Sequence, residues 1–135
     1  MGKKIESIEG IGTRYGKKLR NSGCGTVEQL LELGGTRAGR KRLATESGLD
    51  EKRILKAVNM ADLFRVKGIG AQYAELLEAA GVDTVKELRN RNAGNLAAKM
   101  TAVNESRNLV RQVPSEATVE KWILQAKELP PVVSH

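Results

Sequence analysis

The amino-acid sequence predicts an all-α protein, and three observations point to that fold class. Apolar residues recur at helical spacing along most of the chain, as in segments 50–63 and 115–129. Glycines with a threonine or aspartate one to three residues further on interrupt these segments where one helix ends and the next begins. No segment shows the alternation of apolar and polar residues that is typical of a half-buried strand.

An internal repeat divides the sequence into two similar parts. Residues 8–30 align without a gap on residues 66–88, at an offset of 58, and nine of the 23 aligned positions are identical. The identical pairs are Gly10/Gly68, Ile11/Ile69, Gly12/Gly70, Tyr15/Tyr73, Leu19/Leu77, Gly23/Gly81, Thr26/Thr84, Val27/Val85 and Leu30/Leu88. The chain therefore contains two copies of one structural unit.

Each copy predicts a tight turn between two helices, followed by a third helix. A short helix ends at Ile8 or Val66, the Gly-Ile-Gly sequence makes the turn, and the next helix runs to the glycine that ends it. The third helix begins with a capping box, Thr26-x-x-Gln29 in the first copy and Thr84-x-x-Glu87 in the second.

The rest of each copy predicts a pair of helices. Residues 37–46 and 50–63 form the first pair, with Gly48 as the break and Asp50 as the cap. Residues 93–104 and 115–129 form the second pair. Aligning Leu63 with Leu129 gives an offset of 66, which places about eight extra residues between 100 and 115. We expect a first half at 1–63, a second half at 64–129 and a flexible tail at 130–135.

The composition excludes several classes of protein. The chain has one cysteine, Cys24, and one histidine, His135, so it has neither a disulfide framework nor the ligands of a zinc site. The carboxylate pairs Asp50/Glu51 and Glu75/Glu78 lack matching metal ligands. We expect no enzyme, no metal and no cofactor. The chain also lacks a secretory signal and a membrane-spanning run, which predicts a cytoplasmic protein that does not bind membranes.

Two unusual side chains are predicted to be structural. Cys24 stands where the second copy has Val82, which favours a small buried hydrophobic residue over a reactive thiol. Trp122 shares a helical face with Val119, Ile123 and Ala126, a spacing typical of core packing.

The charge is positive and unevenly distributed. Lys and Arg exceed Asp and Glu by seven in the whole chain, and residues 1–56 carry six of those seven charges. The helix after the first turn carries Arg14, Lys17 and Lys18, whereas the second copy has Gln72, Glu75 and Leu76 there. Such a balance favours a polyanionic partner on the first half. Aromatic residues make up only 3% of the chain, which argues against a surface that stacks single-stranded bases.

The Gly-Ile-Gly turn followed by a helix resembles the helix-hairpin-helix motif, and two copies resemble the tandem helix-hairpin-helix (SAM-like) fold. Nearly the whole chain resembles a family of uncharacterised, mostly bacterial proteins known only as a domain of unknown function. That similarity rests on residues 54–63, 73–88 and 119–129. The helix-hairpin-helix resemblance implies two halves packed as one compact helical domain that contacts duplex DNA through its phosphates, without reading sequence.

Elementary electrostatics supports the same expectation. Backbone N–H groups at a turn and at the first turn of a helix lie at the positive end of the helix dipole, which favours an anion. We expect the first turn to dominate and the second to contribute less. The predicted phosphate-binding residues are Gly10, Ile11, Gly12, Thr13, Arg14, Lys17, Lys18, Lys67, Gly68 and Gly70.

Other interpretations remain open at this stage. The basic run 39–43 either continues the phosphate surface or forms a solvated helix face. Residues 43–57 also resemble a helix-turn-helix, which would place Lys52, Arg53 and Lys56 on a recognition helix. The whole chain could instead be a protein-interaction or assembly module. RNA, another polyanion or an acidic protein would also suit the charge, and the oligomeric state is open.

Overall fold

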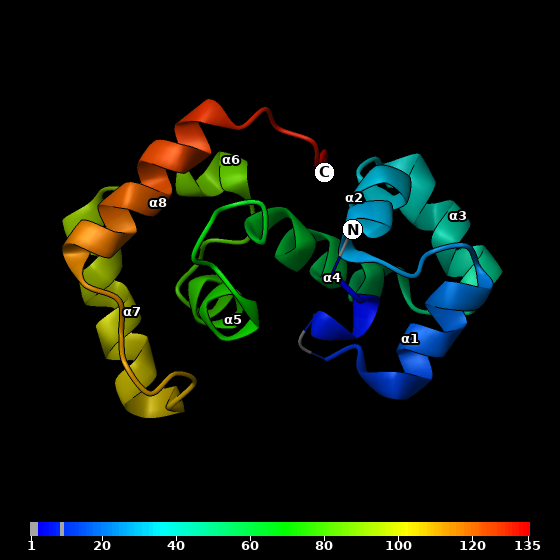
Figure 1. The fold of residues 1–135 in the computed structure, drawn as a ribbon, viewed down its shortest axis with the longest axis horizontal. Coiled ribbons are helices and arrows are strands. Elements are labelled where there is room, and N and C mark those ends of the chain that lie inside the picture. Colours follow the sequence, from blue (N-terminus) through cyan, green and yellow to red (C-terminus); the bar gives the residue numbers. More distant parts are fainter. Residues whose placement is uncertain (1–2, 9) are drawn as a thin grey trace. The chain divides into compact units, whose positions relative to one another are not determined.

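The computed structural model describes residues 3–8 and 10–135, and these residues form eight α-helices and one short 3-10 helix, with no β-strand (Figure 1). The predicted all-α class is confirmed. None of the helices in this described part is long and apolar enough to cross a membrane.

The helices fall into two compact units, Met1–Asp62 with Val132–His135, and Leu63–Pro131. The boundary lies at the end of one helix, one residue from the boundary expected from the repeat. The first unit contains η1 (Ile5–Ser7), α1 (Gly12–Asn21), α2 (Val27–Gly34), α3 (Arg37–Ser47) and α4 (Glu51–Leu63, whose last residue falls in the second unit). The second unit contains α5 (Ala71–Ala79), α6 (Val85–Leu88), α7 (Ala93–Arg107) and α8 (Glu116–Glu128).

The threonines predicted to cap helices form the expected hydrogen bonds. The Thr26 hydroxyl accepts from the Gln29 N–H at 3.1 Å, and the Thr84 hydroxyl accepts from the Glu87 N–H at 3.3 Å. The Gln29 side chain accepts from the Gly25 N–H, one residue before the position that a standard capping box uses. Gly48 ends α3 with a φ of +77°, as its place in the sequence predicts.

The sequence offset that relates α4 to α8, the last helices of the two units, differs from the predicted offset. Both α4 and α8 have 13 residues, and they begin at Glu51 and Glu116, an offset of 65 rather than 66. This offset pairs buried positions with buried positions, for example Ile54 with Val119 and Ala57 with Trp122. The single shared leucine used for the sequence alignment is a weaker guide than the buried face of the helix. The extra residues lengthen both α7 and the loop that follows it.

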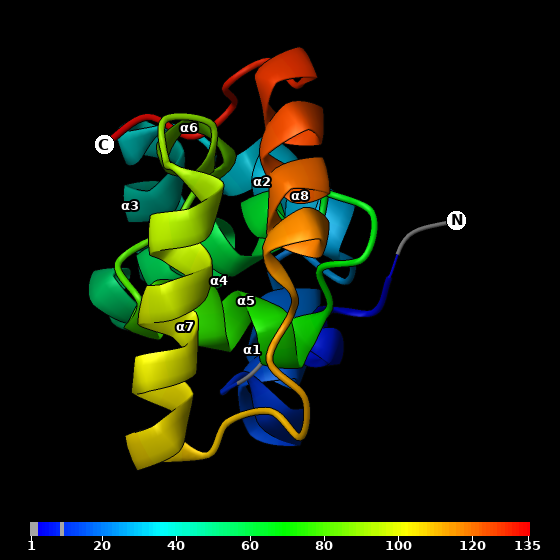
Figure 2. The same ribbon diagram turned by 90° about the vertical axis from the view of Figure 1, so that its left-hand side faces the viewer.

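Close packing fixes the helices within each unit. Gly34, the last residue of α2, lies so near α4 that a methyl group there would come within 2.7 Å of the Val58 side chain. In the second unit, α7 and α8 run antiparallel and side by side (Figures 1 and 2). Small residues at such points let helices approach and bury their apolar faces.

The end of the chain differs from the expected flexible tail. The Ser134 N–H donates to the Gly35 carbonyl at 2.9 Å, and the Arg40 guanidinium donates to the Ser134 carbonyl at 2.6 Å. The His135 ring nitrogen lies 3.2 Å from the Asn59 side-chain oxygen. Residues Val132–His135 thus belong to the first unit. The composition of this segment, Val-Val-Ser-His, gives no sign of these partners.

Both side chains predicted to be structural are buried. Cys24 is fully buried, like Val82 at the matching place of the second unit, and Trp122 is 3% exposed. Burial raises the pKa of the Cys24 thiol to about 11, because the charged thiolate would lose its hydration.

Burial of Cys24 predicts a pH dependence of stability. The thiol pKa rises from 9.0 in an exposed chain to about 11 in the folded protein, so the folded state holds the proton longer. The free energy of unfolding should therefore fall as the pH rises from 9 towards 11. Urea unfolding at several pH values checks this. The variant Cys24→Val, which copies Val82, should lose less stability over that interval, and an identical loss in both proteins would contradict the account.

Candidate nucleic-acid interface

The first turn, Gly10–Gly12, is stabilised by a buried side chain and an internal hydrogen bond. Gly10 and Gly12 have φ values of +89° and +63°, and the Ile11 side chain between them is 3% exposed. The Ile11 N–H donates to the Ile8 carbonyl at 3.2 Å. The amide of Ile11, predicted to face a phosphate, is therefore used inside the turn. Gly10 and Gly12 are exposed and remain available to a ligand.

Helix α1 starts at this turn without a capping side chain, because Ile11 at its N-cap position has no acceptor. The side chains that cap α2, α3, α6, α7 and α8 each accept a backbone N–H. Thr13, Arg14 and Lys17 follow on α1 and are exposed, whereas Lys18 is half-buried. The backbone N–H groups at the N-terminal end of α1 therefore have no capping side chain, and exposed cations lie beside them.

One cation of α1, Arg20, has a structural partner. Arg20 forms a salt bridge with Glu6 of η1 at 2.6 Å, and its hydrogen bonds hold the pKa of the Glu6 carboxyl below its usual range. This pair ties η1 to α1. Arg20 is exposed, but its charge is balanced by the Glu6 carboxylate, so it adds little to the positive charge of α1.

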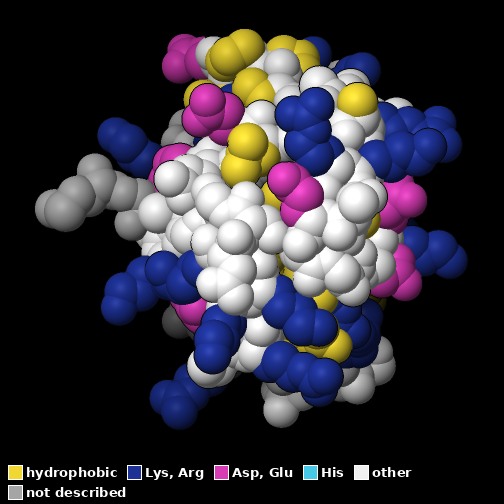
Figure 3. All heavy atoms as spheres, turned by 90° about the vertical axis from the view of Figure 1, so that its right-hand side faces the viewer, with side chains coloured by type: hydrophobic (Ala, Val, Ile, Leu, Met, Phe, Trp, Pro, Cys, Tyr) yellow, Lys and Arg dark blue, Asp and Glu magenta, His cyan; other side chains and the backbone are white. Residues whose placement is uncertain are grey.

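Basic side chains gather on the face of the first unit that Figure 3 shows. Lys and Arg dominate the lower part of this view, where α1 lies, and Asp and Glu are scattered mainly above it. The face of the first unit in this view thus carries several of the positive charges of the sequence.

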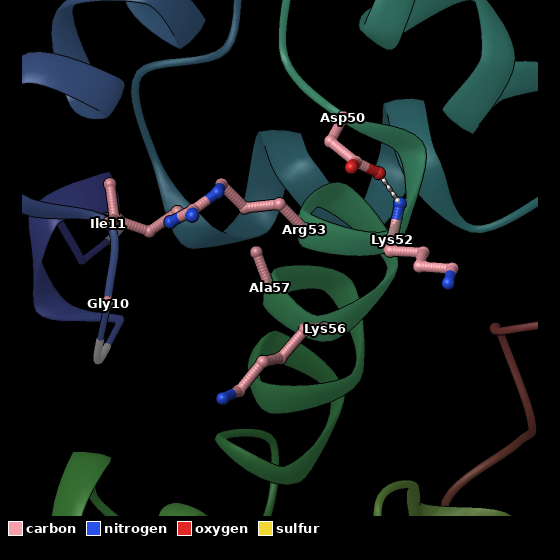
Figure 4. Close-up of a pocket in the computed structure, with 7 residues that line it drawn as sticks. All are labelled: Gly10, Ile11, Asp50, Lys52, Arg53, Lys56 and Ala57. Atoms are coloured by element: carbon pink, nitrogen blue, oxygen red, sulfur yellow. Dashed lines mark hydrogen bonds between the residues drawn. The ribbon is translucent and has the colours of Figure 1, made fainter.

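Helix α4 adds basic residues that the sequence did not connect with the first turn. A pocket of about 320 Å³ lies between the first turn and α4 (Figure 4), and we call it the turn pocket. Its lining residues are Gly10, Ile11, Asp50, Lys52, Arg53, Lys56 and Ala57. The sequence pattern places these lysines and this arginine only on the recognition helix of a helix-turn-helix. No sequence signal shows that α4 folds back beside the first turn.

Arg53 is oriented by an aromatic ring. Its guanidinium carbon lies 4.2 Å from the ring centre of Tyr15, a cation–π contact between α4 and α1. Stacking uses the face of the guanidinium and leaves its in-plane N–H groups for hydrogen bonds. In Figure 4 Arg53 and Lys56 extend towards the side of the first turn, and Lys52 extends the other way.

The second turn, Gly68–Gly70, resembles the first at Gly68 and Ile69 but differs at its last glycine, since Gly70 has a φ of −98° where Gly12 has +63°. Gly68 has a φ of +98°, and the Ile69 N–H donates to the Val66 carbonyl at 3.2 Å. The Lys67 N–H donates to the Gln125 side chain at 3.0 Å, and that side chain donates back to the Lys67 carbonyl at 3.3 Å. The Lys67 amide is therefore occupied by α8, while the Lys67 side chain is exposed.

An indole covers this second turn. A methyl group on Gly68 would lie 3.0 Å from the Trp122 ring nitrogen, and the Trp122 ring centre lies 5.3 Å from that of Tyr73. The Tyr73 hydroxyl donates to the Gln112 carbonyl at 3.1 Å. The Lys67 backbone is thus bonded to α8, whereas the Lys67 side chain and Gly68 are exposed. A role for Lys67, Gly68 and Gly70 stays a prediction.

The basic run 39–43 divides between the core and the surface. Arg40 is 5% exposed, and its guanidinium donates to the carbonyls of Gly34 and Gly35 at 3.0 and 3.1 Å, and to Ser134. Lys41 and Arg42 are exposed. For Arg40 both interpretations of the run are wrong, because it joins the end of α2 to the end of the chain.

The acidic residues have ordinary structural positions. Asp50 accepts from the Lys52 N–H at 2.7 Å at the start of α4. Within residues 3–8 and 10–135, no group of three or more His, Cys, Asp or Glu lies together in a way that could hold a metal ion.

The buried arginine generates a prediction about stability. Arg40→Met keeps the length of the side chain but removes the guanidinium donor from three carbonyl groups, of which that of Gly35 keeps the Ser134 N–H. The free energy of unfolding should therefore fall by about 2 kcal/mol. Arg42→Met, on the exposed face of the same helix, should change it by less than about 0.5 kcal/mol. Urea unfolding followed by circular dichroism measures both. A fall in the free energy of unfolding for Arg40→Met no larger than that for Arg42→Met would contradict the structural role of Arg40.

Comparison with known proteins assigns the chain to a family. The model of the family described as a domain of unknown function (DUF4332) matches residues 9–129, so the chain belongs to that family, as its resemblance predicted. No solved structure matches the chain.

Proposed function

We propose that this member of the DUF4332 family binds duplex DNA without sequence preference, by holding backbone phosphates at the first turn. The observation that carries the proposal is the arrangement of cations around that turn. Arg14 and Lys17 follow it on α1, and Arg53 and Lys56 line the pocket that it forms with α4. Cations from two helices near exposed glycines suit the oxygen atoms of a phosphate.

We also propose the tandem helix-hairpin-helix arrangement for the two units. Both turns bury an isoleucine and both place their first glycine at a positive φ, +89° for Gly10 and +98° for Gly68. Both use the same internal hydrogen bond, from Ile11 to Ile8 and from Ile69 to Val66. These matches support one motif used twice.

The charges support binding that is independent of sequence. Lysine and arginine contacts to phosphates fix a protein on DNA but do not distinguish bases. Arg14 and Lys17 are exposed on the short helix α1 and can make such contacts. The proposal is for a binding protein and includes no catalytic step.

The two turns should contribute unequally. Trp122 and Gln125 cover the second turn, and α5 carries Gln72 and Glu75 where α1 has Arg14 and Lys17. We therefore propose that the first unit supplies most of the phosphate contacts. A one-sided contact of this kind gives modest affinity and a strong dependence on salt.

The proposal predicts the behaviour of a charge-reversal variant. Arg14→Glu/Lys17→Glu should lower the affinity for duplex DNA at least about tenfold and reduce the log–log salt slope by about two, because two phosphate contacts are lost. Fluorescence anisotropy with a labelled duplex across a salt series measures both quantities.

A matched variant separates a local site from a general charge effect. Lys86→Glu/Lys99→Glu makes the same change in net charge on exposed positions of α6 and α7, and it should keep most of the affinity. Equal losses in the two double variants would contradict a site at the first turn. Absence of wild-type binding at low salt would contradict DNA binding altogether and favour a protein-docking role.

A further inference from the structure

The turn pocket occupies a place that is filled in the second unit. At the observed offset of 65, Ala57 of α4 corresponds to Trp122 of α8, and Gly10 corresponds to Gly68 through the repeat. In the second unit the Trp122 indole lies against Gly68. In the first unit the small Ala57 stands in that place, and a pocket of about 320 Å³ opens between it and Gly10.

The aromatic partner of each turn differs in the same way. Tyr73 of the second unit has the Trp122 ring beside it at 5.3 Å, whereas Tyr15 of the first unit has the Arg53 guanidinium over its ring at 4.2 Å. One unit thus closes the space with an indole. The other leaves the space open and holds a cation at its edge.

The chemistry of the lining favours a compact anion. Arg53 and Lys56 extend towards the side of the first turn, and Ile11 and Ala57, both 3% exposed, supply an apolar floor (Figure 4). Asp50 also lines the pocket, but its carboxylate accepts from the Lys52 N–H. Arginine offers several donors in one plane and lysine adds a point charge, a combination that suits phosphate oxygens.

We propose that the turn pocket binds a phosphate monoester, the group carried by a phosphorylated strand end or by a free mononucleotide. A monoester carries a charge of about −1.5 to −2 near neutral pH, which matches the two cations directed at the space. It also presents three oxygen atoms to a recess. A phosphate inside a duplex carries one charge and continues into the strand on both sides, so it fits an open helix surface better than a pocket.

The volume agrees with a ligand of that size. Small-molecule pockets commonly measure roughly 300 to 1,000 Å³, and the turn pocket lies at the lower end of that range. It has room for a phosphate and part of the attached nucleoside. The inference rests on the proposed function in one respect, since both place phosphate at the first turn, and it extends that function to strand ends.

The test compares two duplexes that differ only in one group. The same blunt duplex is prepared with a 5′-phosphate or a 5′-hydroxyl at its ends, and anisotropy gives both affinities. A second arm follows the Ile11 and Ala57 methyl signals by NMR during addition of deoxyadenosine 5′-monophosphate or deoxyadenosine. The duplex arm reports strand ends and the second arm reports the free nucleotide.

Two variants address the pocket by different means. Ala57→Trp fills the space as Trp122 does in the second unit and leaves the charge unchanged. Arg53→Gln/Lys56→Gln removes the two cations and leaves the volume nearly unchanged. The control Lys41→Gln/Arg42→Gln removes two exposed charges from α3. Circular dichroism and thermal unfolding establish whether each variant is folded. If Ala57→Trp does not fold, Arg53→Gln/Lys56→Gln alone tests the pocket.

The wild-type protein should prefer the phosphorylated duplex by about tenfold. The preference should disappear in both pocket variants and remain in the control. Equal affinity for the two duplexes, or a preference that survives in the pocket variants, would overturn the inference while leaving backbone binding intact. If the wild type binds neither duplex, the proposed function fails and the second arm decides. Methyl shifts with the monophosphate but not with the nucleoside would support the pocket, and their absence would overturn it.

Discussion

A buried isoleucine between two glycines is the constraint on which each unit depends. Ile11 and Ile69 are 3% and 2% exposed, and each directs its backbone N–H to a carbonyl three residues earlier. The glycine before each isoleucine has a φ near +90°, a conformation that other residues rarely adopt. The turn therefore buries its side chain and presents its backbone, and a helix begins one residue after Ile11 and two residues after Ile69. What the turn can do then depends on what packs against it.

The two turns have different neighbours. Trp122 and Gln125 cover the second turn, one by packing and the other by two hydrogen bonds. At the first turn Ala57 leaves space, and Arg53 lies over Tyr15 beside it. A duplicated unit can keep one copy for packing while the other gains charge and an open surface. The basic side chains of α1 and α4 agree with the proposal that the first unit supplies most of the phosphate contacts.

Features that depend on neighbours in the sequence could be predicted, and features that depend on distant partners could not. The capping threonine at 26 and the glycine break at 48 act within one turn of a helix, so their residue types predict them. Trp122 was predicted to be buried because its helix has one apolar face. Arg40 looked like a surface charge, since its three carbonyl partners lie at the end of α2 and the end of the chain. The turn pocket could not be predicted, because no local pattern shows which helix folds back beside the first turn.

Backbone amide NMR during titration with a short duplex tests the central claim, that the first turn holds phosphate and the second contributes little. The account predicts shifts in Gly10–Lys18 and in Arg53–Ala57, with the signals of Lys67–Gly70 nearly unchanged. Comparable shifts at both turns would contradict the division of roles between the units. Shifts confined to the second unit, or no shifts at low salt, would contradict phosphate binding at the first turn.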